Sequence, residues 1–367
     1  MKSHIWKMFN VLVVLCLYSS VSVRTAAETQ YESNIKYLGA DWGPNGDTIY
    51  FVKQITSKKR TTGGLADLIG GVENLGSHIW FCKMKWDGSE KQEIAELWTG
   101  QGPYIDTQNG PIWMEVNGAT SNALISVEYG MATVGIWVLG LDGKNLHKPF
   151  EPIWNDKEKE RDDHGSWSPD GSKIVYCKDS QRLEVFDLKT RQRTQLTDGI
   201  RDLHPVWSPK GEWIAYTHHL RYDPKYAIRH IWLIRPDGKE TKPLMNEKGE
   251  EVKGWWPSWN PVGTSVSIAD STLWMAETAT NKTDYINPMP ILGELLPYTF
   301  MAHHWGKRGW LLTGSGAIRF IDETSRRGRL LAVGGIYQLS SKDNRWGSPP
   351  EDIPPRVEPV RKAIQRL

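Results

Sequence analysis

Two histidines and one tryptophan stand at the same place in three related stretches of this 367-residue chain. His164, His204 and Trp256 each lie three residues before the tryptophan of a recurring motif. Imidazole nitrogens that converge from neighbouring strands could hold a divalent metal, or one imidazole could act as a general base. The indole could stack on a sugar ring. These residue types therefore suggest metal binding, proton transfer or ligand stacking at one shared place.

A second group of candidates lies in the segment 217–229, between two predicted strands. Its histidine, arginine and tyrosine side chains include His218, His219, Arg221, Tyr222 and Arg229. An arginine here could neutralise the carboxylate of an acidic ligand. In the last repeat, His303 and His304 lie close to the place equivalent to His164 and His204, and these four are the candidate metal ligands. A divalent metal is thus a candidate cofactor, but no cofactor is certain.

A structural role competes with these functional ones. His164 and His204 could instead hydrogen-bond to neighbouring backbone and stabilise the repeat. A metal site would need three or more of the six candidate histidines within reach of one point. We also expect His204 to bury little area, so that its replacement by alanine would weaken binding and hardly change folding.

The motif that must position these residues is Trp-Ser-Pro-Asp/Lys-Gly, followed by β-branched and aromatic residues such as 173–176 and 212–216. The residue before proline is extended, proline starts a turn with its fixed φ, and glycine closes the turn where φ is positive. The run that follows has the composition of a strand. Each copy therefore predicts a strand, a tight turn and a second strand.

The motif recurs along the chain, and Trp167 lies 40 residues before Trp207. This period is typical of one blade of a β-propeller. Six copies are recognisable, two of them degenerate, and their tryptophans are Trp42, Trp113, Trp167, Trp207, Trp259 and Trp305. A second strand-and-turn motif alternates with them, at 78–81, 135–138, 183–186, 230–233, 272–275 and 317–320. The alternation predicts an all-β fold, a six-bladed β-propeller of four-stranded antiparallel blades.

These residues resemble the TolB family of propellers, whose repeat carries the Trp-Ser-Pro-Asp-Gly turn. The resemblance covers roughly residues 34–338, is close at Trp167 and Trp207, and fades at Trp113 and Trp305. It implies a six-bladed ring around a central channel. The α/β domain that TolB itself places before its ring is not expected, because the first repeat begins at Asp41. The histidine placement is also similar to that of oligogalacturonate lyases, propellers of a related repeat type with metal-binding histidines in the channel.

In such a ring, the residue three before each motif tryptophan is expected at one mouth of the channel. These positions are Gly39, Gly110, His164, His204, Trp256 and Ala302. Two long loops, predicted at 54–77 and 217–229, would open on the same face, where binding usually occurs. Ring closure is expected to borrow a strand from the other end of the chain, either 34–38 or 329–333.

The two ends of the chain differ from the repeats. Residues 1–27 have the pattern of a secretory signal: lysines, a short apolar run and then small residues. Residues 339–367 are rich in proline and are expected to form a tail. Without the signal, 42 Lys and Arg face 43 Asp and Glu, so no basic excess indicates nucleic acid. Cys82 and Cys177 then remain and are expected to be buried apolar residues rather than a disulfide framework.

Two functions of different classes follow from this pattern. The first is a non-catalytic binding module, periplasmic or secreted, that grips an envelope protein or a glycan at the channel mouth. The second is a metal-dependent lyase of acidic polysaccharides that uses the same histidines. The sequence contains no Gly-x-Ser-x-Gly, His-Glu-x-x-His or phosphate-loop motif. We expect a monomer that contacts a membrane only if its signal stays uncleaved.

Overall fold

The computed structural model describes residues 28–62, 71–100, 112–127, 135–150, 162–199, 201–221, 228–269, 273–286, 303–305, 310–314, 317–322, 328–333 and 335–339. Within these ranges every regular element is a strand, as the sequence predicts. The predicted signal and all but the first residue of the predicted tail lie outside the described residues. No helix of the described part is long and apolar enough to cross a membrane.

The strands pair with antiparallel neighbours into six sheets, which we number in chain order. The first contains β1 (Glu28–Trp42), β2 (Thr48–Thr62), β3 (Val72–Lys85), β4 (Gln92–Gly100) and β24 (Gly335–Leu339). The second contains β5 (Ile112–Asn117), β6 (Asn122–Val127) and β7 (Gly135–Gly140). The third contains β8 (Asp162–Trp167), β9 (Lys173–Lys178), β10 (Arg182–Asp187) and β11 (Arg193–Gln195).

The remaining three sheets each have four strands. The fourth contains β12 (Asp202–Trp207), β13 (Ile214–Arg221), β14 (Ile228–Ile234) and β15 (Thr241–Pro243). The fifth contains β16 (Trp255–Trp259), β17 (Ser265–Ala269), β18 (Leu273–Glu277) and β19 (Thr283–Ile286). The sixth contains β20 (His303–Trp305), β21 (Trp310–Gly314), β22 (Ala317–Asp322) and β23 (Gly328–Val333).

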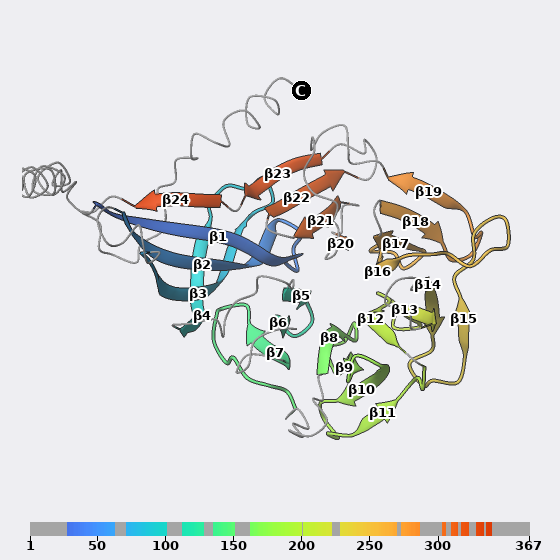
Figure 1. Cartoon of the computed structure of the whole chain (residues 1–367). Helices are drawn as coiled ribbons and strands as arrows, with labels where there is room; N and C mark the ends of the chain where they lie inside the picture. Colours follow the sequence, from blue (N-terminus) through green and yellow to red (C-terminus); the bar gives the residue numbers. More distant parts are fainter. Residues whose placement is uncertain are drawn as a thin grey trace, which may run out of the picture.

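The six sheets stand in a ring, with the first strand of each nearest the centre (Figure 1). These inner strands contact one another in sequence, from β1 through β5, β8, β12, β16 and β20 and back to β1. The second sheet differs from the expected four strands. In its described residues, a single antiparallel bridge between Val138 and His147 takes the place of an outer strand.

The predicted turns form through the residues of the motif. In the third sheet the Ser168 carbonyl accepts a hydrogen bond from Gly171 N–H, at 2.8 Å, and its hydroxyl accepts one from Lys173 N–H, at 2.9 Å. Gly171 has a φ of 70° and Gly211, in the equivalent turn of the fourth sheet, has 75°. This left-handed conformation favours glycine, so the turn is set by local sequence.

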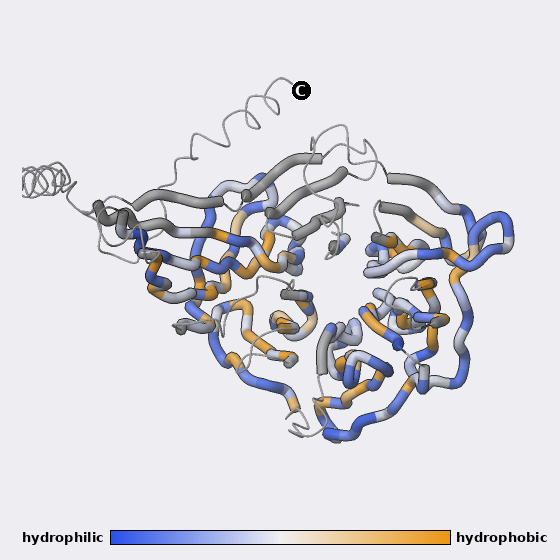
Figure 2. The backbone as a smooth tube through the Cα atoms, viewed as in Figure 1, coloured by the Kyte–Doolittle hydropathy of each residue, from blue (hydrophilic) through white to orange (hydrophobic). Residues whose placement is uncertain are grey.

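The core lies between neighbouring sheets. Tyr176 and Trp167 pack in a cluster shared by the second and third sheets, and Trp207 and Tyr216 in one shared by the third and fourth. Hydrophobic residues concentrate in the middle strands, whereas the outer strands β11 and β15 are hydrophilic (Figure 2). Burying the faces between sheets therefore leaves the polar strands at the rim of the ring. Cys82 and Cys177 are buried and form no disulfide, as expected.

Three expectations about connections are wrong. The segment 217–229 is not a loop throughout, because β13 extends to Arg221 and β14 begins at Ile228. The segment 54–77 is not a long loop, because β2 extends to Thr62 and β3 begins at Val72. Likewise, residues 34–38 and 329–333 lie in strands of their own sheets, β1 and β23. The strand added from the other end of the chain is β24, which pairs with the first half of β1.

Candidate functional site

Three residues near the centre of the ring share an unusual backbone conformation. His164, His204 and Trp256 have φ values of 48°, 52° and 49°. Each lies where the pairing between its inner strand and the next strand shifts register. A β-bulge of this kind re-aims a side chain, and a non-glycine residue at positive φ stores strain that often marks a functional position.

The bulges bring these three aromatic rings into contact. The His204 and Trp256 ring centroids are 3.7 Å apart with planes at 20°, and His164 meets His204 edge to face at 4.4 Å. His164 also contacts Trp256, at 5.1 Å. All three are buried, and His204 is only 5% exposed. Our expectation that His204 buries little area is therefore wrong.

The second sheet contributes a fourth aromatic ring, that of Trp113, which the sequence analysis took as the motif tryptophan of its repeat. Val116 pairs with Ala123, seven residues later, as Trp167 pairs with Ile174. Val116 thus takes the place of the motif tryptophan, and Trp113 stands three residues before it, equivalent to His164. The position of the second sheet equivalent to His164 is therefore Trp113 rather than Gly110. The available signal was the turn residue Asn117, which follows Val116 directly as Ser168 follows Trp167.

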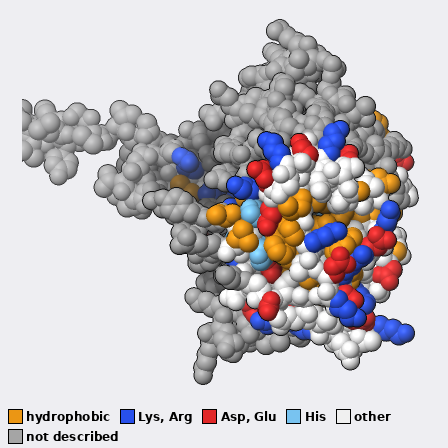
Figure 3. Space-filling view, turned by 90° about the vertical axis from the view of Figure 1, so that its right-hand side faces the viewer, with side chains coloured by type: hydrophobic (Ala, Val, Ile, Leu, Met, Phe, Trp, Pro, Cys, Tyr) orange, Lys and Arg blue, Asp and Glu red, His pale blue; other side chains and the backbone are white. Residues whose placement is uncertain are grey.

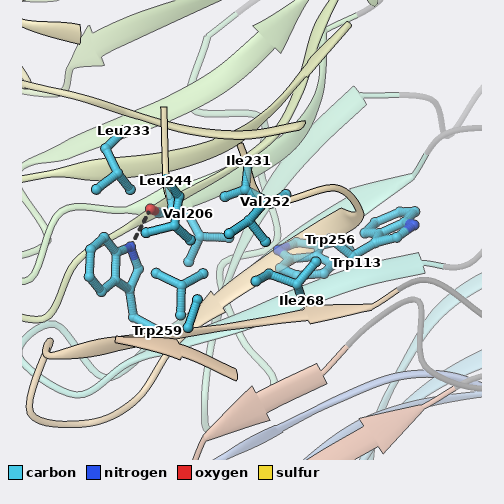
Figure 4. Close-up of a cluster of buried hydrophobic side chains, with 12 residues drawn as sticks. Trp113, Val206, Ile231, Leu233, Leu244, Val252, Trp256, Trp259 and Ile268 are labelled. Carbon is cyan, nitrogen blue, oxygen red and sulfur yellow. Dashed lines mark hydrogen bonds between the residues drawn. The ribbon is translucent and has the colours of Figure 1, made fainter. Parts of the chain in front are cut away.

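Trp113 completes a group that we call the aromatic layer: Trp113, His164, His204 and Trp256. Its indole stacks on Trp256 with centroids 5.6 Å apart and planes at 22° (Figure 4). On another side it contacts His304, at 4.8 Å. Gly39 lies in β1, next to the bulge of that strand, whereas Gly110 and Ala302 lie outside the described residues.

Burial keeps the central imidazoles neutral. The pKa of His204 lies well below its ordinary value, first because of burial and then because of the charges of His164, His219, Arg201 and Arg229. Burial lowers the pKa of His304 to about 3. At neutral pH these rings therefore act as neutral hydrogen-bonding or stacking groups rather than as cations.

A second group, which we call the basic rim, adjoins the layer and contains Arg201, His219, Arg229 and Trp255. The Arg229 guanidinium carbon lies 3.1 Å from the centroid of a Trp255 ring, and Trp255 faces His204 at 6.2 Å. His219 pairs with Arg229 across β13 and β14, and its ring lies 6.3 Å from Trp255. Arg201 precedes β12, and its carbonyl accepts a hydrogen bond from His219 N–H at 3.1 Å.

His219 is the unusual member of this rim. It is 2% exposed, yet neither ring nitrogen has a hydrogen-bond partner in the described part of the chain. Burial, followed by the charges of Arg229 and Arg201, lowers the pKa of His219 to about 4. A buried polar ring without a partner is costly, so it is a natural place for a ligand to supply one. Arg201 was missed by the sequence analysis because it lies outside the predicted loop.

The other predicted site residues lie elsewhere. The side chain of His218, which neighbours His219 on a strand, points to the opposite face, where its Nδ1 donates to Asp202 Oδ1 at 2.6 Å. Its ring packs on Trp232 at 4.6 Å. Arg221 ends β13 and His303 begins β20, but their side chains lie outside the described set, as does all of Tyr222.

The described donors do not form a metal centre. Among the side chains that the structure describes, no group of three or more His, Cys, Asp or Glu residues could hold an ion. His164 and His204 pack ring against ring, and His304 turns its Nδ1 toward Asp41 Oδ1 at 3.6 Å. The side chain of His303, the fourth predicted ligand, is outside the described set.

Neither sign of charge dominates the coloured part of the face shown in Figure 3. Figure 3, which faces the side on which β15 lies in Figure 1, shows acidic and basic side chains interspersed around a more hydrophobic centre. The exposed large hydrophobic residues of the described part are Val72, Leu220, Ile228 and Val262. Leu220 lies near the end of β13 and Ile228 begins β14, so two of these exposed apolar side chains come from the connected ends of one strand pair.

No family model matches the sequence, and neither does any curated protein. Solved structures do resemble this chain. TolB from Acinetobacter baumannii is 10% identical, with 79% of this chain and 82% of that one covered and a TM-score of 0.50. An oligogalacturonate lyase in complex with manganese is 12% identical, covering 88% of this chain and 81% of that one with a TM-score of 0.48. A second such lyase, from Vibrio parahaemolyticus, is 10% identical, with coverage of 85% and 83% and the same TM-score.

The fold is a β-propeller. This conclusion rests on the ring of antiparallel sheets together with the similarity to TolB, and at such low identity the similarity extends to the fold alone. The aromatic layer then lies where the inner strands of the propeller begin, and the basic rim lies beside it at the fourth and fifth sheets.

Proposed function

We propose that this chain is a TolB-like propeller whose six sheets are its blades and whose channel mouth is a non-catalytic binding site. In this proposal residues 1–27 are a secretory signal, 34–338 form the ring and 339–367 form a tail. The protein acts in the periplasm or outside the cell, as a monomer, on an envelope protein or a glycan. The observation that carries the binding role is the junction of the aromatic layer with the basic rim.

The chemistry of this junction suits a ligand with both a flat and an anionic part. Trp255 presents a large surface to a sugar ring or an aromatic side chain. Stacking on Trp255 holds the Arg229 guanidinium in one orientation, which favours recognition of a carboxylate by paired hydrogen bonds. His219, buried and neutral, supplies a further donor or acceptor.

The lyase hypothesis receives less support than the binding module. It needs at least three donors directed at one point, and the described histidines pack face to face or edge to face instead. We therefore derive no catalytic step for this site.

The experiment compares Arg229→Ala with a matched control, Arg235→Ala. Arg235 also covers a tryptophan, Trp213, at 4.0 Å, but it belongs to an exposed ion pair with Glu240. Residues 28–367 of each variant are applied to immobilised neutral and carboxylated oligosaccharides and to defined peptides of envelope proteins. We expect the wild type and Arg235→Ala to be retained on the same probe. The affinity of Arg229→Ala for that probe should be at least tenfold lower. Equal retention by both variants, or no retention of the wild type on any probe, would overturn the proposal.

A further inference from the structure

A line of hydrogen bonds joins the inner strands of the first four sheets. In each of the first three sheets the acceptor is the residue directly before Trp42, Val116 or Trp167. Its side chain accepts a hydrogen bond from a backbone N–H of the next sheet. Asp41 Oδ2 accepts from Val116 N–H at 2.6 Å, and Glu115 Oε1 accepts from Trp167 N–H at 3.1 Å. Ser166 Oγ accepts from Trp207 N–H at 3.0 Å. The first two acceptors of this line are carboxyl groups.

Both carboxyl groups lie in the interior, and Asp41 Oδ2 bonds to the backbone N–H of Val116, the residue directly after Glu115. Asp41 is 6% exposed, and Glu115 Oε2 is buried with no hydrogen-bond partner among the described residues. The two groups interact electrostatically, and each disfavours ionisation of the other. An acceptor without a donor becomes a donor if its carboxyl group is protonated, so a proton on Glu115 would remove one buried unsatisfied charge.

The groups around the pair offer no compensating positive charge in the described part. From β20, His304 places Nδ1 at 3.6 Å from Asp41 Oδ1, but burial keeps this imidazole neutral. From β2, Tyr50 is the residue paired with Asp41, and from β8 the uncharged hydroxyl of Ser166 opposes the rise in the pKa of Glu115. The side chains of β21 to β24 are outside the described set.

We propose that Asp41 and Glu115 share one proton at neutral pH and form a pH-sensitive joint between the first, second and third sheets. Two carboxyl groups that interact electrostatically in the interior titrate as a pair rather than singly. With one proton the joint holds both interstrand hydrogen bonds without placing two charges side by side. When the proton leaves, the two carboxylates repel each other inside the ring.

Burial supports this assignment. It raises the pKa of Asp41 from 3.8 to about 7. Burial, together with the charge of Asp41, raises the pKa of Glu115 from 4.5 to about 8. Groups with raised values contribute stability that is complete below their ordinary pKa and is lost as pH rises through the folded value. The joint should therefore weaken between about pH 4 and about pH 8.

The joint also contacts the aromatic layer. His304 faces Asp41 on one side and Trp113 on the other, and Trp113 stacks on Trp256. A change in the charge of Asp41 thus acts on a ring that packs against the layer. Loss of the shared proton is expected to loosen the mouth as well as the contact between sheets.

The test uses Glu115→Gln, whose amide oxygen can still accept from Trp167 N–H while the side chain remains uncharged. The control is Asp237→Asn, an exposed turn residue whose pKa is lowered by the Lys239 N–H. Urea midpoints are measured from pH 6.5 to pH 9. We expect the midpoint of the wild type and of the control to fall as pH rises, and that of Glu115→Gln to fall measurably less. A wild-type midpoint that stays constant, or equal slopes for all three proteins, would overturn the proposal.

Infrared spectroscopy of the wild type keeps the proposal testable even if Glu115→Gln does not fold. A shared proton gives an absorption band of a protonated carboxylic acid at pH 6.5 that disappears by pH 9. In Asp41→Asn, removal of the neighbouring charge should move this disappearance to lower pH. Absence of the band from the wild type at pH 6.5 would show that both carboxyl groups are ionised, contrary to the proposal.

Discussion

The imidazole of His204 lies on the indole of Trp256, with ring centroids 3.7 Å apart and planes at 20°. Both residues are held at positive φ, 52° and 49°, in two neighbouring sheets. The contact therefore combines backbone strain, which is unfavourable, with aromatic packing, which is favourable. Changes that separate the two contributions can measure each of them.

At position 204 glycine should be less destabilising than alanine. Both substitutions remove the ring, but only alanine keeps a Cβ at a left-handed φ, which costs about 1 kcal/mol. We expect His204→Gly to unfold at a higher urea concentration than His204→Ala. At Val206, which is buried in the same strand and has no positive φ, the order should be reversed. The same order at both positions would contradict the assigned strain.

Two glycines with nearly equal φ should differ in their tolerance of alanine. Gly46 and Gly171 have φ values of 71° and 70°. A Cβ at Gly46 would meet nothing within 4 Å, whereas at Gly171 it would lie 2.3 Å from Thr120 Cγ2. Gly46→Ala should cost about 1 kcal/mol of unfolding free energy, and Gly171→Ala clearly more. Equal losses in urea unfolding would show that the turn containing Gly171 does not pack on the second sheet.

Two motif tryptophans should respond differently to phenylalanine. Trp259 Nε1 donates to the Val206 carbonyl of the fourth sheet at 3.1 Å (Figure 4), whereas Trp167 Nε1 is buried with no partner in the described part. Trp259→Phe should cost about 1 to 3 kcal/mol more than Trp167→Phe, because it leaves a buried carbonyl unsatisfied. Differential scanning calorimetry of the two variants compares the stability that each one loses. A larger loss for Trp167→Phe than for Trp259→Phe would contradict the prediction.

Acid should destabilise the protein through buried histidines that are neutral in the folded state. The pKa values of His219 and His304 are lowered to about 4 and about 3 by burial. Groups with lowered values contribute stability above their ordinary pKa of 6.5 and lose it as pH falls through the folded value. His219→Gln should therefore lose less stability than the wild type between about pH 7 and pH 4. Asp41 and Glu115 contribute equally to both proteins, so their opposite pH dependence cancels in the comparison. Urea midpoints that fall in parallel for the two proteins as pH is lowered would contradict the prediction.

Much of the strand content was predictable because it depends on neighbouring residues. Ser168, Pro169 and Gly171 make a turn by themselves, through bonds that span only a few positions. The two alternating motifs therefore located most of the strands. The prediction failed where the local signal is weak, as in the segment 54–77, whose glycines and basic residues suggested a loop but which mostly continues β2 and β3.

The site was only partly predictable. His164, His204 and Trp256 share one motif position, and the structure brings them together. Trp113 could not be placed, because its role depends on a register in which Val116 pairs with Ala123. His218 and His219 looked equivalent in sequence, but adjacent strand residues point to opposite faces, so only His219 reaches the basic rim.

The sequence by itself determined the all-β class, the repeat and the positions of its turns, because turn and strand preferences act over a few residues. Only the tertiary structure decided that Asp41 hydrogen-bonds to Val116 of the second sheet, that Arg229 covers Trp255, and that β24 joins β1. Those contacts join segments far apart in the chain. They depend on how the sheets pack and on the register of each inner strand, which burial and interstrand hydrogen bonds select together.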